Sequence, residues 1–310
     1  MICLALSLSL PLQSQTVVFY NVENLFHPDN DSLHADDDFT PEGKYRWSKR
    51  RYYHKLHQIA RVLTCIEDDY PALVGLAEVE QERCVRDLCR QMPKARYKYI
   101  HFDSPDRRGI DVALLYDSVA FEPTVARPLP VYLDSSTTTR DILYVSGNLQ
   151  SSIFHTFRSC FSEAKNLQIF ICHLPSQRGG SAESSWKRER AKMVLRHHCD
   201  SILSADSTAH ILVIGDMNSD PQNDLQPLAL LPLNIQSSIG THRYQGRWSQ
   251  LDQAFVSPSL AAATFSVFAP DWLLEPDNKY LGYKPRRTFV GFRYNPDGFS
   301  DHLPIVVNLK

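Results

Sequence analysis

The chain has 310 residues, 43% of them hydrophobic and 22% charged, and its 33 basic and 35 acidic side chains give a formal net charge of -2. This is the composition of a folded globular protein, and it excludes a disordered, collagen-like or coiled-coil chain. The near-neutral charge excludes a chain-wide positive field for nucleic acid and leaves room only for a local basic patch.

The chain begins with an apolar run, Ile2 to Leu12, that is about half the length needed to span a bilayer as a helix. We expect residues 1–15 to be a signal peptide and the protein to be exported to the periplasm or beyond the cell. No basic residue precedes the run, and Leu12-Gln13-Ser14 is a poor cleavage site. The alternatives are a mis-called start codon or a buried N-terminal strand.

The strand candidates are short runs of apolar, β-branched and aromatic residues. Several are apolar throughout, as expected of strands covered on both faces. In chain order they are residues 16–21, 72–77, 97–101, 110–116, 166–173, 211–216, 251–257 and 305–309.

Two stretches show the spacing of three and four residues between apolar positions that is typical of an amphipathic helix. They are residues 49–67 and 183–203, and a weaker candidate covers residues 80–92. Residues 28–46 and 104–108 are expected to be loops, and residues 270–295 a long irregular loop. Nothing in the middle of the chain has the composition of a linker, so we expect one domain over residues 16–310.

The seven cysteines are scattered and contain no CxxC pair, which argues against a zinc or redox motif. If the protein is exported, a disulfide among Cys65, Cys84 and Cys89 is conceivable. The odd number of cysteines leaves at least one thiol unpaired.

One pattern recurs along the chain: a hydrophobic strand runs into a polar residue at its carboxyl end, where α/β proteins bind their ligands. A single such residue would usually be a cap or a turn former. Seven instances in one chain indicate a shared site. They are Asn21, Glu78, Asp111, His173, Asp216 with Asn218, Asp252, and Asp301 with His302.

Several carboxylates in one pocket repel one another unless a cation lies among them. Glu78, Asp216, Asp252 and Asp301 therefore imply a hard divalent metal ion. Oxygen ligands suit Mg²⁺, or Mn²⁺, better than zinc. His173 and His302 would then be free to donate hydrogen bonds to phosphate oxygens.

At this point the motifs match a known family. From Asn21 to His302 the chain resembles the endonuclease/exonuclease/phosphatase superfamily, which includes deoxyribonucleases, abasic-site endonucleases, sphingomyelinases and inositol-phosphate phosphatases. The segments GDMNSDP around Asp216 and SDHLP around His302 are the most specific, and the motifs follow in the family's order.

The resemblance assigns roles to these residues. It implies that Glu78 binds the metal, helped by Asn21 and Asp301. It also implies that Asp216 orients or deprotonates the attacking water and that Asn218 holds the scissile phosphate.

The same resemblance pairs Asp252 with His302, which would stabilise charge on the phosphoryl group. His173 resembles the family's second histidine, near the leaving oxygen, and Asp111 is the candidate for its carboxylate partner. Glu23 stands where the abasic-site enzymes carry an acidic residue, two positions after the first asparagine.

The implied fold is a four-layer α/β sandwich, in which two mixed β-sheets pack face to face with helices outside. The implied reaction is in-line attack of water on a phosphate ester, which needs charge neutralisation and alignment more than covalent chemistry.

Two further segments stay open. In residues 176–180, two glycines could bring backbone N–H groups to a phosphate with Arg178 as a clamp, but a plain loop explains them equally well. The basic and aromatic residues between positions 44 and 53 could bind a polyanion, or could belong to a solvated helix end.

We therefore expect a divalent-metal-dependent phosphodiester hydrolase, an exported endo- or exonuclease on DNA or RNA that is monomeric and has no membrane anchor. The alternatives are a phosphoesterase of the same superfamily acting on phospholipid, sphingomyelin or inositol phosphate, and an inactive binding protein. Lipid hydrolysis would call for an exposed apolar hairpin, and the sequence shows no convincing one. An inactive protein would lack a carboxylate or histidine of the set, and none is missing.

Overall fold

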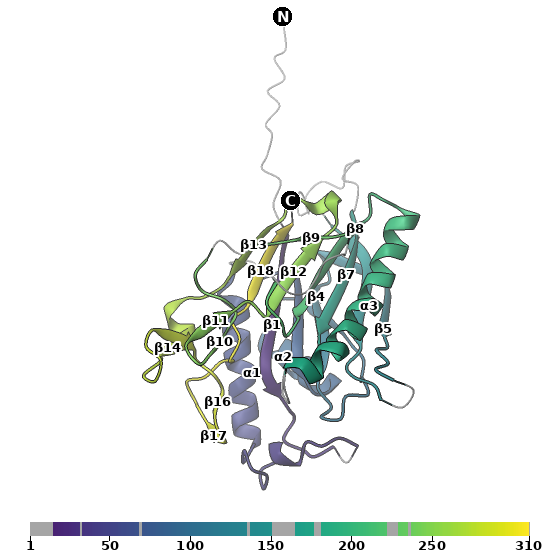
Figure 1. Ribbon diagram of the computed structural model, residues 1–310. Helices are drawn as coiled ribbons and strands as arrows, with labels where there is room; N and C mark the ends of the chain where they lie inside the picture. Colours follow the sequence, from purple (N-terminus) through teal and green to yellow (C-terminus); the bar gives the residue numbers. More distant parts are fainter. Residues whose placement is uncertain are drawn as a thin grey trace, which may run out of the picture.

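Two six-stranded sheets lie face to face at the centre of the molecule (Figure 1). The computed structural model describes residues 15–31, 33–67, 70–134, 137–150, 165–176, 181–221, 229–234 and 237–309, with only the backbone of 181–183. The first sheet has the order β13-β18-β1-β2-β4-β3, with bounds Thr264–Val267, Ile305–Leu309, Gln15–Leu25, Leu73–Val79, Asp111–Asp117 and Tyr97–His101. The second has the order β5-β6-β7-β8-β12-β9, with bounds Phe121–Leu129, Ile142–Leu149, Lys165–His173, His210–Asp216, Asp252–Val256 and Leu231–Pro232.

Each sheet is mixed, because it contains one parallel pair among antiparallel neighbours. The parallel pairs are β1 with β2 and β7 with β8. Helices α1 (Lys49–Thr64) and α2 (Glu82–Gln91) pack on the outer face of the first sheet, and α3 (Ser181–Ala205) packs on the outer face of the second (Figure 1). The predicted four-layer α/β sandwich is confirmed.

Helix α1 shows why these segments fold as they do. Ser48 precedes it in an extended conformation, and its side chain accepts a hydrogen bond from the Arg51 N–H, which caps the first turn. The expected stripe is buried against the first sheet, with Tyr52, Leu56 and Ile59 fully enclosed. No helix among the described residues is long and apolar enough to cross a membrane.

The layer between the sheets is apolar, and it ends in polar residues. Side chains two apart along a strand share a face. Phe19, Ile171, Ile214 and Ala254 face this central layer. The residue two positions after each of the first three, and two positions before Ala254 in the antiparallel strand β12, reaches the edge of the layer. Those residues are Asn21, His173, Asp216 and Asp252.

Three of these residues form one row across the second sheet. Asp216 of β8 lies opposite His173 of the parallel strand β7 and opposite Asp252 of the antiparallel strand β12. Residues that lie opposite one another in a sheet project from the same face. Strand pairing alone therefore brings His173, Asp216 and Asp252 together.

Short hairpins extend from one side of the sandwich (Figure 1). Within residues 270–295, expected to be an irregular loop, the structure contains two hairpins and one 3-10 turn, so that prediction is corrected. The two hairpins in this range are β14 with β15 (Leu274–Pro276, Tyr283–Pro285) and β16 with β17 (Phe289–Val290, Arg293–Tyr294). A third hairpin, β10 with β11 (His242–Tyr244, Arg247–Ser249), precedes them in the chain. Single-turn 3-10 helices lie at Asp37–Phe39, Pro258–Leu260 and Asp271–Leu273.

All eight predicted strands and all three helices are present, with ends that differ by up to four residues. Strands β5 and β6 were not predicted. The described cysteines, which include Cys65, Cys84 and Cys89, are free thiols, so the disulfide considered among these three is not formed. Of the predicted signal peptide, residues 1–15, residues 1–14 lie outside the described residues and Gln15 is the first residue of β1.

The structure explains why the GDMN segment begins with a glycine, Gly215. This glycine lies opposite Cys172 in the parallel pair, and a Cβ atom at Gly215 would be 2.3 Å from the Cys172 carbonyl oxygen. Because that oxygen belongs to the backbone, the strand itself would have to move. The residue before Asp216 must therefore be glycine for β7 and β8 to pair as they do.

We expect Gly215→Ala to lower the free energy of unfolding by about 2–3 kcal/mol, the cost of forcing atoms into a packed region. Gly291→Ala is the control, because a Cβ there meets nothing within 4 Å and pays only for its φ of 62°, about 1 kcal/mol. Urea unfolding of both variants tests this. If both variants lose the same free energy of unfolding, the short distance from a Cβ at residue 215 to the Cys172 carbonyl does not require glycine there.

Candidate active site

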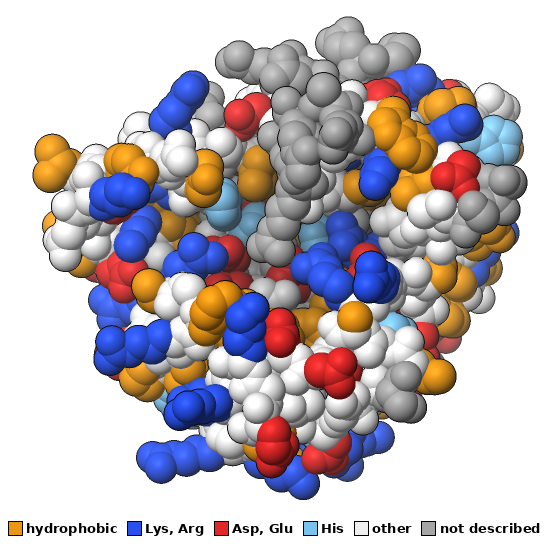
Figure 2. Space-filling view, turned by 60° about the horizontal axis from the view of Figure 1, so that its bottom comes forward, with side chains coloured by type: hydrophobic (Ala, Val, Ile, Leu, Met, Phe, Trp, Pro, Cys, Tyr) orange, Lys and Arg blue, Asp and Glu red, His pale blue; other side chains and the backbone are white. Residues whose placement is uncertain are grey.

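Figure 2 views the molecule from the side where β1 ends, and shows histidine and acidic side chains inside a hollow with Lys and Arg side chains around it. The centre of the site is the row of β7, β8 and β12 residues, joined by His302 just before β18. All four side chains, His173, Asp216, Asp252 and His302, are buried.

His302 lies between two carboxylates. Its Nδ1 is 2.7 Å from Oδ2 of Asp252, and its Nε2 is 3.8 Å from Oδ2 of Asp216. Burial alone would lower the pKa of His302, but the carboxylates of Asp252 and Asp216 outweigh burial and raise that pKa well above its usual value. The geometry therefore favours an imidazolium at neutral pH.

Asp216 is held by neighbouring groups on two sides. Its Oδ2 accepts a hydrogen bond from Nδ2 of Asn21 at 3.1 Å, and its Oδ1 accepts one from the backbone N–H of Asn218 at 2.9 Å. Burial raises the pKa of Asp216 to about 7; His302 opposes this shift and the carboxylate of Asp252 adds to it. A carboxylate with that pKa can take up a proton at neutral pH.

Asn218 lies in the turn that follows β8, at a φ of 51°. Its side-chain Nδ2 donates a hydrogen bond to the Leu174 carbonyl oxygen at 2.9 Å. Asparagine tolerates this left-handed conformation better than most residues. The structure thus places Asn218 beside Asp216, as its predicted phosphate-binding role would need.

Glu78 reaches the site from a bulge in the first sheet. The register of β2 shifts on both sides between Ala77 and Val79, and Glu78 has a φ of 63°. Bulges of this kind redirect a side chain. Oε2 of Glu78 accepts the Asn24 N–H at 2.8 Å, while Oε1 lies 3.9 Å from Nε2 of His173.

His173 faces acids contributed by both sheets. Its Nε2 lies 3.7 Å from Oδ2 of Asp216, in addition to its approach to Glu78. His173 is therefore close to a carboxylate from each sheet, Glu78 of the first and Asp216 of the second.

Asp301 is paired with an arginine that the sequence did not single out. Arg287 donates a hydrogen bond from NH2 to Oδ2 of Asp301 at 2.8 Å, and its Nε lies 3.6 Å from Oε1 of Glu23. Burial opposes the charged form of Asp301, but His302 and Arg287 lower its pKa below the usual value. Glu23 also accepts the Thr288 N–H at 2.6 Å, and burial raises its pKa to about 7.

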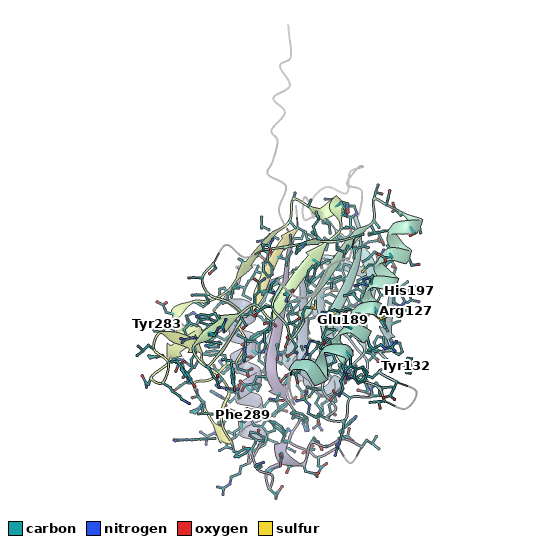
Figure 3. The ribbon with its side chains drawn as sticks, in the orientation of Figure 1. Arg127, Tyr132, Glu189, His197, Tyr283 and Phe289 are labelled. Atoms are coloured by element: carbon teal, nitrogen blue, oxygen red, sulfur yellow. The ribbon has the colours of Figure 1, made fainter. Side chains whose placement is uncertain are left out.

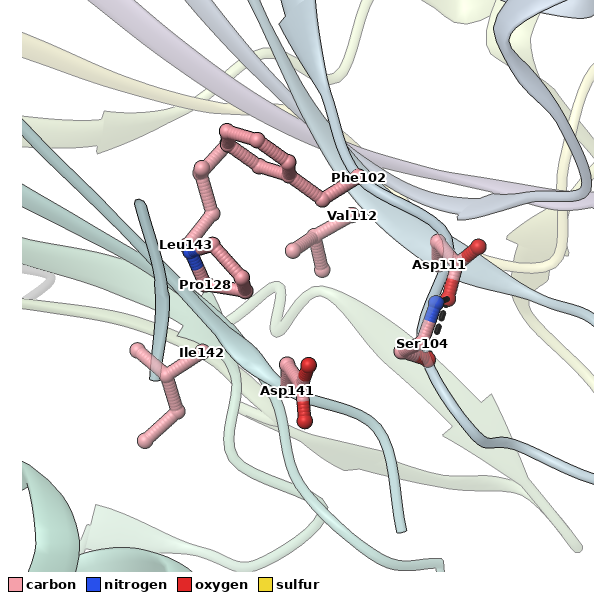
Figure 4. A pocket seen from close by; sticks show the side chains of 8 residues that line it. All are labelled: Phe102, Ser104, Asp111, Val112, Pro128, Asp141, Ile142 and Leu143. Atoms are coloured by element: carbon pink, nitrogen blue, oxygen red, sulfur yellow. Dashed lines mark hydrogen bonds between the residues drawn. The ribbon is translucent and has the colours of Figure 1, made fainter. Parts of the chain in front are cut away.

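Asp111 is held by Ser104 and lies close to His101. Its Oδ1 accepts hydrogen bonds from the Ser104 N–H at 3.1 Å and from the Ser104 hydroxyl (Figure 4). Its Oδ2 lies 3.5 Å from Nε2 of His101. The neighbouring strand β3 ends at His101, beside the start of β4, which explains this pairing. Asp111 therefore contacts His101 and Ser104, and its predicted pairing with His173 stays a prediction.

Figure 4 shows the small pocket beside Asp111, which also includes Asp141. Its volume is about 10 Å³, enough for one water molecule. The pocket is too small for a substrate, so it does not compete with the site around Asp216.

Besides Arg287, sequence reasoning missed two residues that bear on the site. Arg140 is buried and donates from Nε to the His173 carbonyl and from NH2 to the Leu174 carbonyl, both at 3.0 Å, while NH1 meets Asp106 at 3.0 Å. It fixes the end of β7 from which His173 projects. The sequence carries no signal for it, because the preceding residues, Ser135 to Thr139, resemble a plain polar loop.

The second residue is His242 of β10. It forms a β-bridge with His302, and the two ring centroids are 4.9 Å apart. Burial and the nearby His302 lower the pKa of His242 to about 4, so its imidazole is neutral at pH 7. A lone histidine in a polar stretch gave no sequence signal.

The two segments left open by the sequence have different outcomes. Arg178 lies outside the described residues. In the basic segment before and within α1, Trp47 and Tyr52 are buried, and Arg51 donates to the carbonyl oxygens of Tyr45 and Arg46. Much of this segment is therefore structural.

The donor set fits a hard divalent cation. The carboxylates of Asp216 and Asp252 and a ring nitrogen of His302 lie within 4.8 Å of one another, and the Oδ1 atom of Asp252 is buried without a hydrogen-bond partner. Because the His302 imidazolium has no free lone pair, the ligands in this cluster are the carboxylate oxygens. A buried carboxylate oxygen without a donor is costly unless a cation or a water molecule meets it. Carboxylate and amide oxygens dominate the site, as Mg²⁺ and Mn²⁺ prefer.

Comparison with known proteins establishes the class. A model of the endonuclease/exonuclease/phosphatase family matches residues 16–310, and the chain belongs to this family. Members are divalent-metal-dependent hydrolases of phosphoester bonds. No protein with a curated description matches the sequence significantly.

Solved structures share the fold at low sequence identity. A family member from Bacteroides thetaiotaomicron is 17% identical with a TM-score of 0.61, covering 96% of this chain and 98% of its own. A mannosyl-6-phosphatase from the same organism is 17% identical with a TM-score of 0.58, covering 96% and 100%. The human Nocturnin catalytic domain is 13% identical with a TM-score of 0.59, covering 96% and 94%.

The His302–Asp252 pair predicts how stability depends on pH. A raised pKa in the folded state stabilises the fold fully below the unfolded-state pKa of about 6.5, and this contribution is lost as pH rises through the folded-state pKa. We expect Asp252→Asn, in EDTA, to lose about 3 kcal/mol at pH 6, since it breaks a buried ion pair, and clearly less at alkaline pH.

Denaturant unfolding of the wild type and Asp252→Asn across this pH range measures the difference. The control is Asp220→Asn, an exposed aspartate in the segment that contains Asp216, for which little change is expected at any pH. A loss that is constant from acid to alkaline pH would mean that His302 does not carry the charge assigned to it.

Proposed function

We propose that the protein hydrolyses phosphodiester bonds of nucleic acid, with Mg²⁺ or Mn²⁺ as its cofactor. The observation that carries this proposal is the row of His173, Asp216 and Asp252, closed by His302 above it. Export and a monomeric state stay predictions from the sequence.

Asp216 has the position and pKa of a general base for the attacking water. Asn21 and Asn218 fix its two oxygen atoms, so that its orientation is set before substrate binds. An ion held by Glu78, with Asn21 and Asp301, would neutralise negative charge on the substrate phosphate.

His302 would act on the phosphoryl oxygens. Its imidazolium is held by Asp252 at 2.7 Å, which fixes the ring and keeps its proton. A fixed positive charge in a buried site stabilises a transition state whose charge lies on the phosphoryl oxygens. His173, on the other side of Asp216, is positioned to donate a proton to the leaving oxygen.

The names of the structural relatives are consistent with hydrolysis of a phosphoester bond. They differ in the substrate that they indicate, so several substrates have to be compared. TDP2 from Caenorhabditis elegans, in truncated form, matches with a TM-score of 0.61 at 14% identity, covering 96% of this chain and 99% of its own. The mannosyl-6-phosphatase shows that the fold also carries phosphatases named for a sugar phosphate. The assay below therefore includes a phosphomonoester and a lipid.

We expect the purified protein with Mg²⁺ to cleave plasmid DNA or RNA, and an artificial bis-phosphodiester, faster than sphingomyelin or mannose 6-phosphate. Asp216→Asn and His302→Ala should each lower kcat by about 10²–10⁴-fold, because they remove the base and the fixed charge. Asp220→Asn in the same segment should keep wild-type activity. EDTA should abolish turnover, and Mg²⁺ or Mn²⁺ should restore it.

Full turnover in excess EDTA would refute the metal role of Glu78, Asn21 and Asp301. No cleavage of any phosphoester with Mg²⁺, Mn²⁺ or Ca²⁺ would refute the enzymatic proposal. Cleavage of lipid or sugar phosphate alone would refute the nuclease assignment and leave the site chemistry in place.

A further inference from the structure

A group of exposed aromatic rings begins next to the active site. Tyr244 is 67% exposed at the end of β10, and Tyr280 and Tyr283, 39% and 61% exposed, lie in the β14–β15 hairpin. We call these three tyrosines the tyrosine platform. Exposed rings gathered in one place need an explanation, because each would be more stable against a partner.

The platform is continuous with the catalytic centre. His242 packs on His302, and Tyr244 is two residues further along β10. Residues two apart in a strand share a face and lie about 7 Å apart. A ligand whose phosphate lies at His302 would therefore extend past His242 to Tyr244.

One buried arginine holds the two hairpins together. Arg243 donates to the Tyr283 carbonyl at 2.7 Å, the Leu281 carbonyl at 2.6 Å and the Gly246 carbonyl at 3.1 Å, and pairs with Asp277 at 3.3 Å. Its side chain is 7% exposed. The platform is thus rigid before any ligand arrives.

Gly246 lets the two hairpins touch. It has a φ of 81°, and a Cβ there would lie 2.8 Å from Cβ of Tyr280. The Tyr280 side chain therefore rests on the turn that follows Tyr244.

The two hairpins that carry the tyrosine platform have a net positive charge. The β10–β11 and β14–β15 hairpins carry four basic and two acidic side chains, which gives a formal charge of +2. Both acids are already paired, Asp277 with Arg243 and Glu275 with Lys284 at 3.5 Å. Lys279 is exposed, and its Nζ lies 5.0 Å from the Tyr280 ring centroid.

We propose that the tyrosine platform binds single-stranded nucleic acid by stacking bases on Tyr244 and Tyr280, with Lys279 meeting the phosphates. Aromatic rings interleaved with basic side chains are the usual means of binding a single strand. A membrane is the less favoured occupant. Of the four large hydrophobic side chains that the two hairpins expose, three are tyrosines, which carry a polar hydroxyl, and only Leu281 is aliphatic. The inference rests on the proposed phosphodiesterase function and extends it to the substrate's bases.

The test measures binding of a labelled twelve-residue oligothymidylate to Asp216→Asn, which should bind without cutting. Adding Tyr244→Ala or Tyr280→Ala should weaken binding about 5- to 150-fold, the loss expected for one stacked base. An oligomer of the same length without bases should bind all these proteins equally. Lys279→Gln should weaken binding of both oligomers.

Tyr132→Ala is the matched control, because Tyr132 is 66% exposed but lies on the opposite side of the molecule from Tyr283 (Figure 3). It should bind like the Asp216→Asn parent. The substituted tyrosines are exposed, and thermal melting should show that each variant is folded.

Unchanged oligothymidylate binding in both tyrosine variants would overturn the proposal, as would an equal loss for the oligomer without bases. Sedimentation with phosphatidylserine vesicles that is lost in the tyrosine variants, with oligonucleotide binding intact, would assign the platform to a membrane instead. If the parent binds no oligonucleotide while the wild type hydrolyses the artificial phosphodiester, the platform proposal fails and the enzymatic one stands. If oligothymidylate binds through Tyr244 but no phosphodiester is cleaved, the enzymatic proposal fails and the platform proposal stands as a binding site.

Discussion

Asp216 and Asp252 are neighbours in one sheet and both are buried, and the site depends on how their repulsion is relieved. Two carboxylates at such a place cannot both keep their charge without a cation between them. His302 supplies part of that charge, since it touches Asp252 and approaches Asp216. Burial raises the pKa of Asp216 to about 7, the repulsion from Asp252 adds to that rise, and the resulting pKa suits Asp216 to proton transfer. One electrostatic conflict thus accounts for the histidine, the base and the need for a metal.

The fold places this conflict at the edge of its apolar interior. Strands of both sheets send alternate side chains into the central layer, and at the edge where the site lies the series in β1, β7, β8 and β12 end in a polar residue. The apolar part of the layer holds the sheets together, while its polar end lies in the hollow. Stability and chemistry are therefore properties of successive residues in the same strands, such as Ile214 and Asp216.

The sequence predicted most of the main strands, because most are continuous apolar runs covered on both faces. It missed β6, although that strand is almost entirely buried. Strand β5 escaped because most of its side chains are exposed and it contains Pro123 and Pro128, which argue against a strand. The short hairpins also escaped, because they are two or three residues long and depend on distant contacts such as those of Arg243. Local patterns do not encode such contacts.

Among site residues, those that end an apolar run could be found from the sequence. Arg140, Arg287 and His242 could not, because each acts through a partner distant in the chain and lies in an unremarkable polar segment. Asp111 begins its strand, and its Oδ2 lies 3.5 Å from Nε2 of His101, a neighbour that the sequence pattern did not indicate. A strand-end acid marks a sheet edge, and the neighbouring strand decides what it meets.

The row formed by His173, Asp216 and Asp252 also limits how the gene can change. One residue inserted into β8 ahead of Asp216 would turn that carboxylate to the opposite face, because side chains alternate along a strand. The loops after the row carry no such restriction. Insertions and deletions should therefore collect beyond the strand ends, where a lineage can acquire new substrates while the spacing inside its strands stays constant.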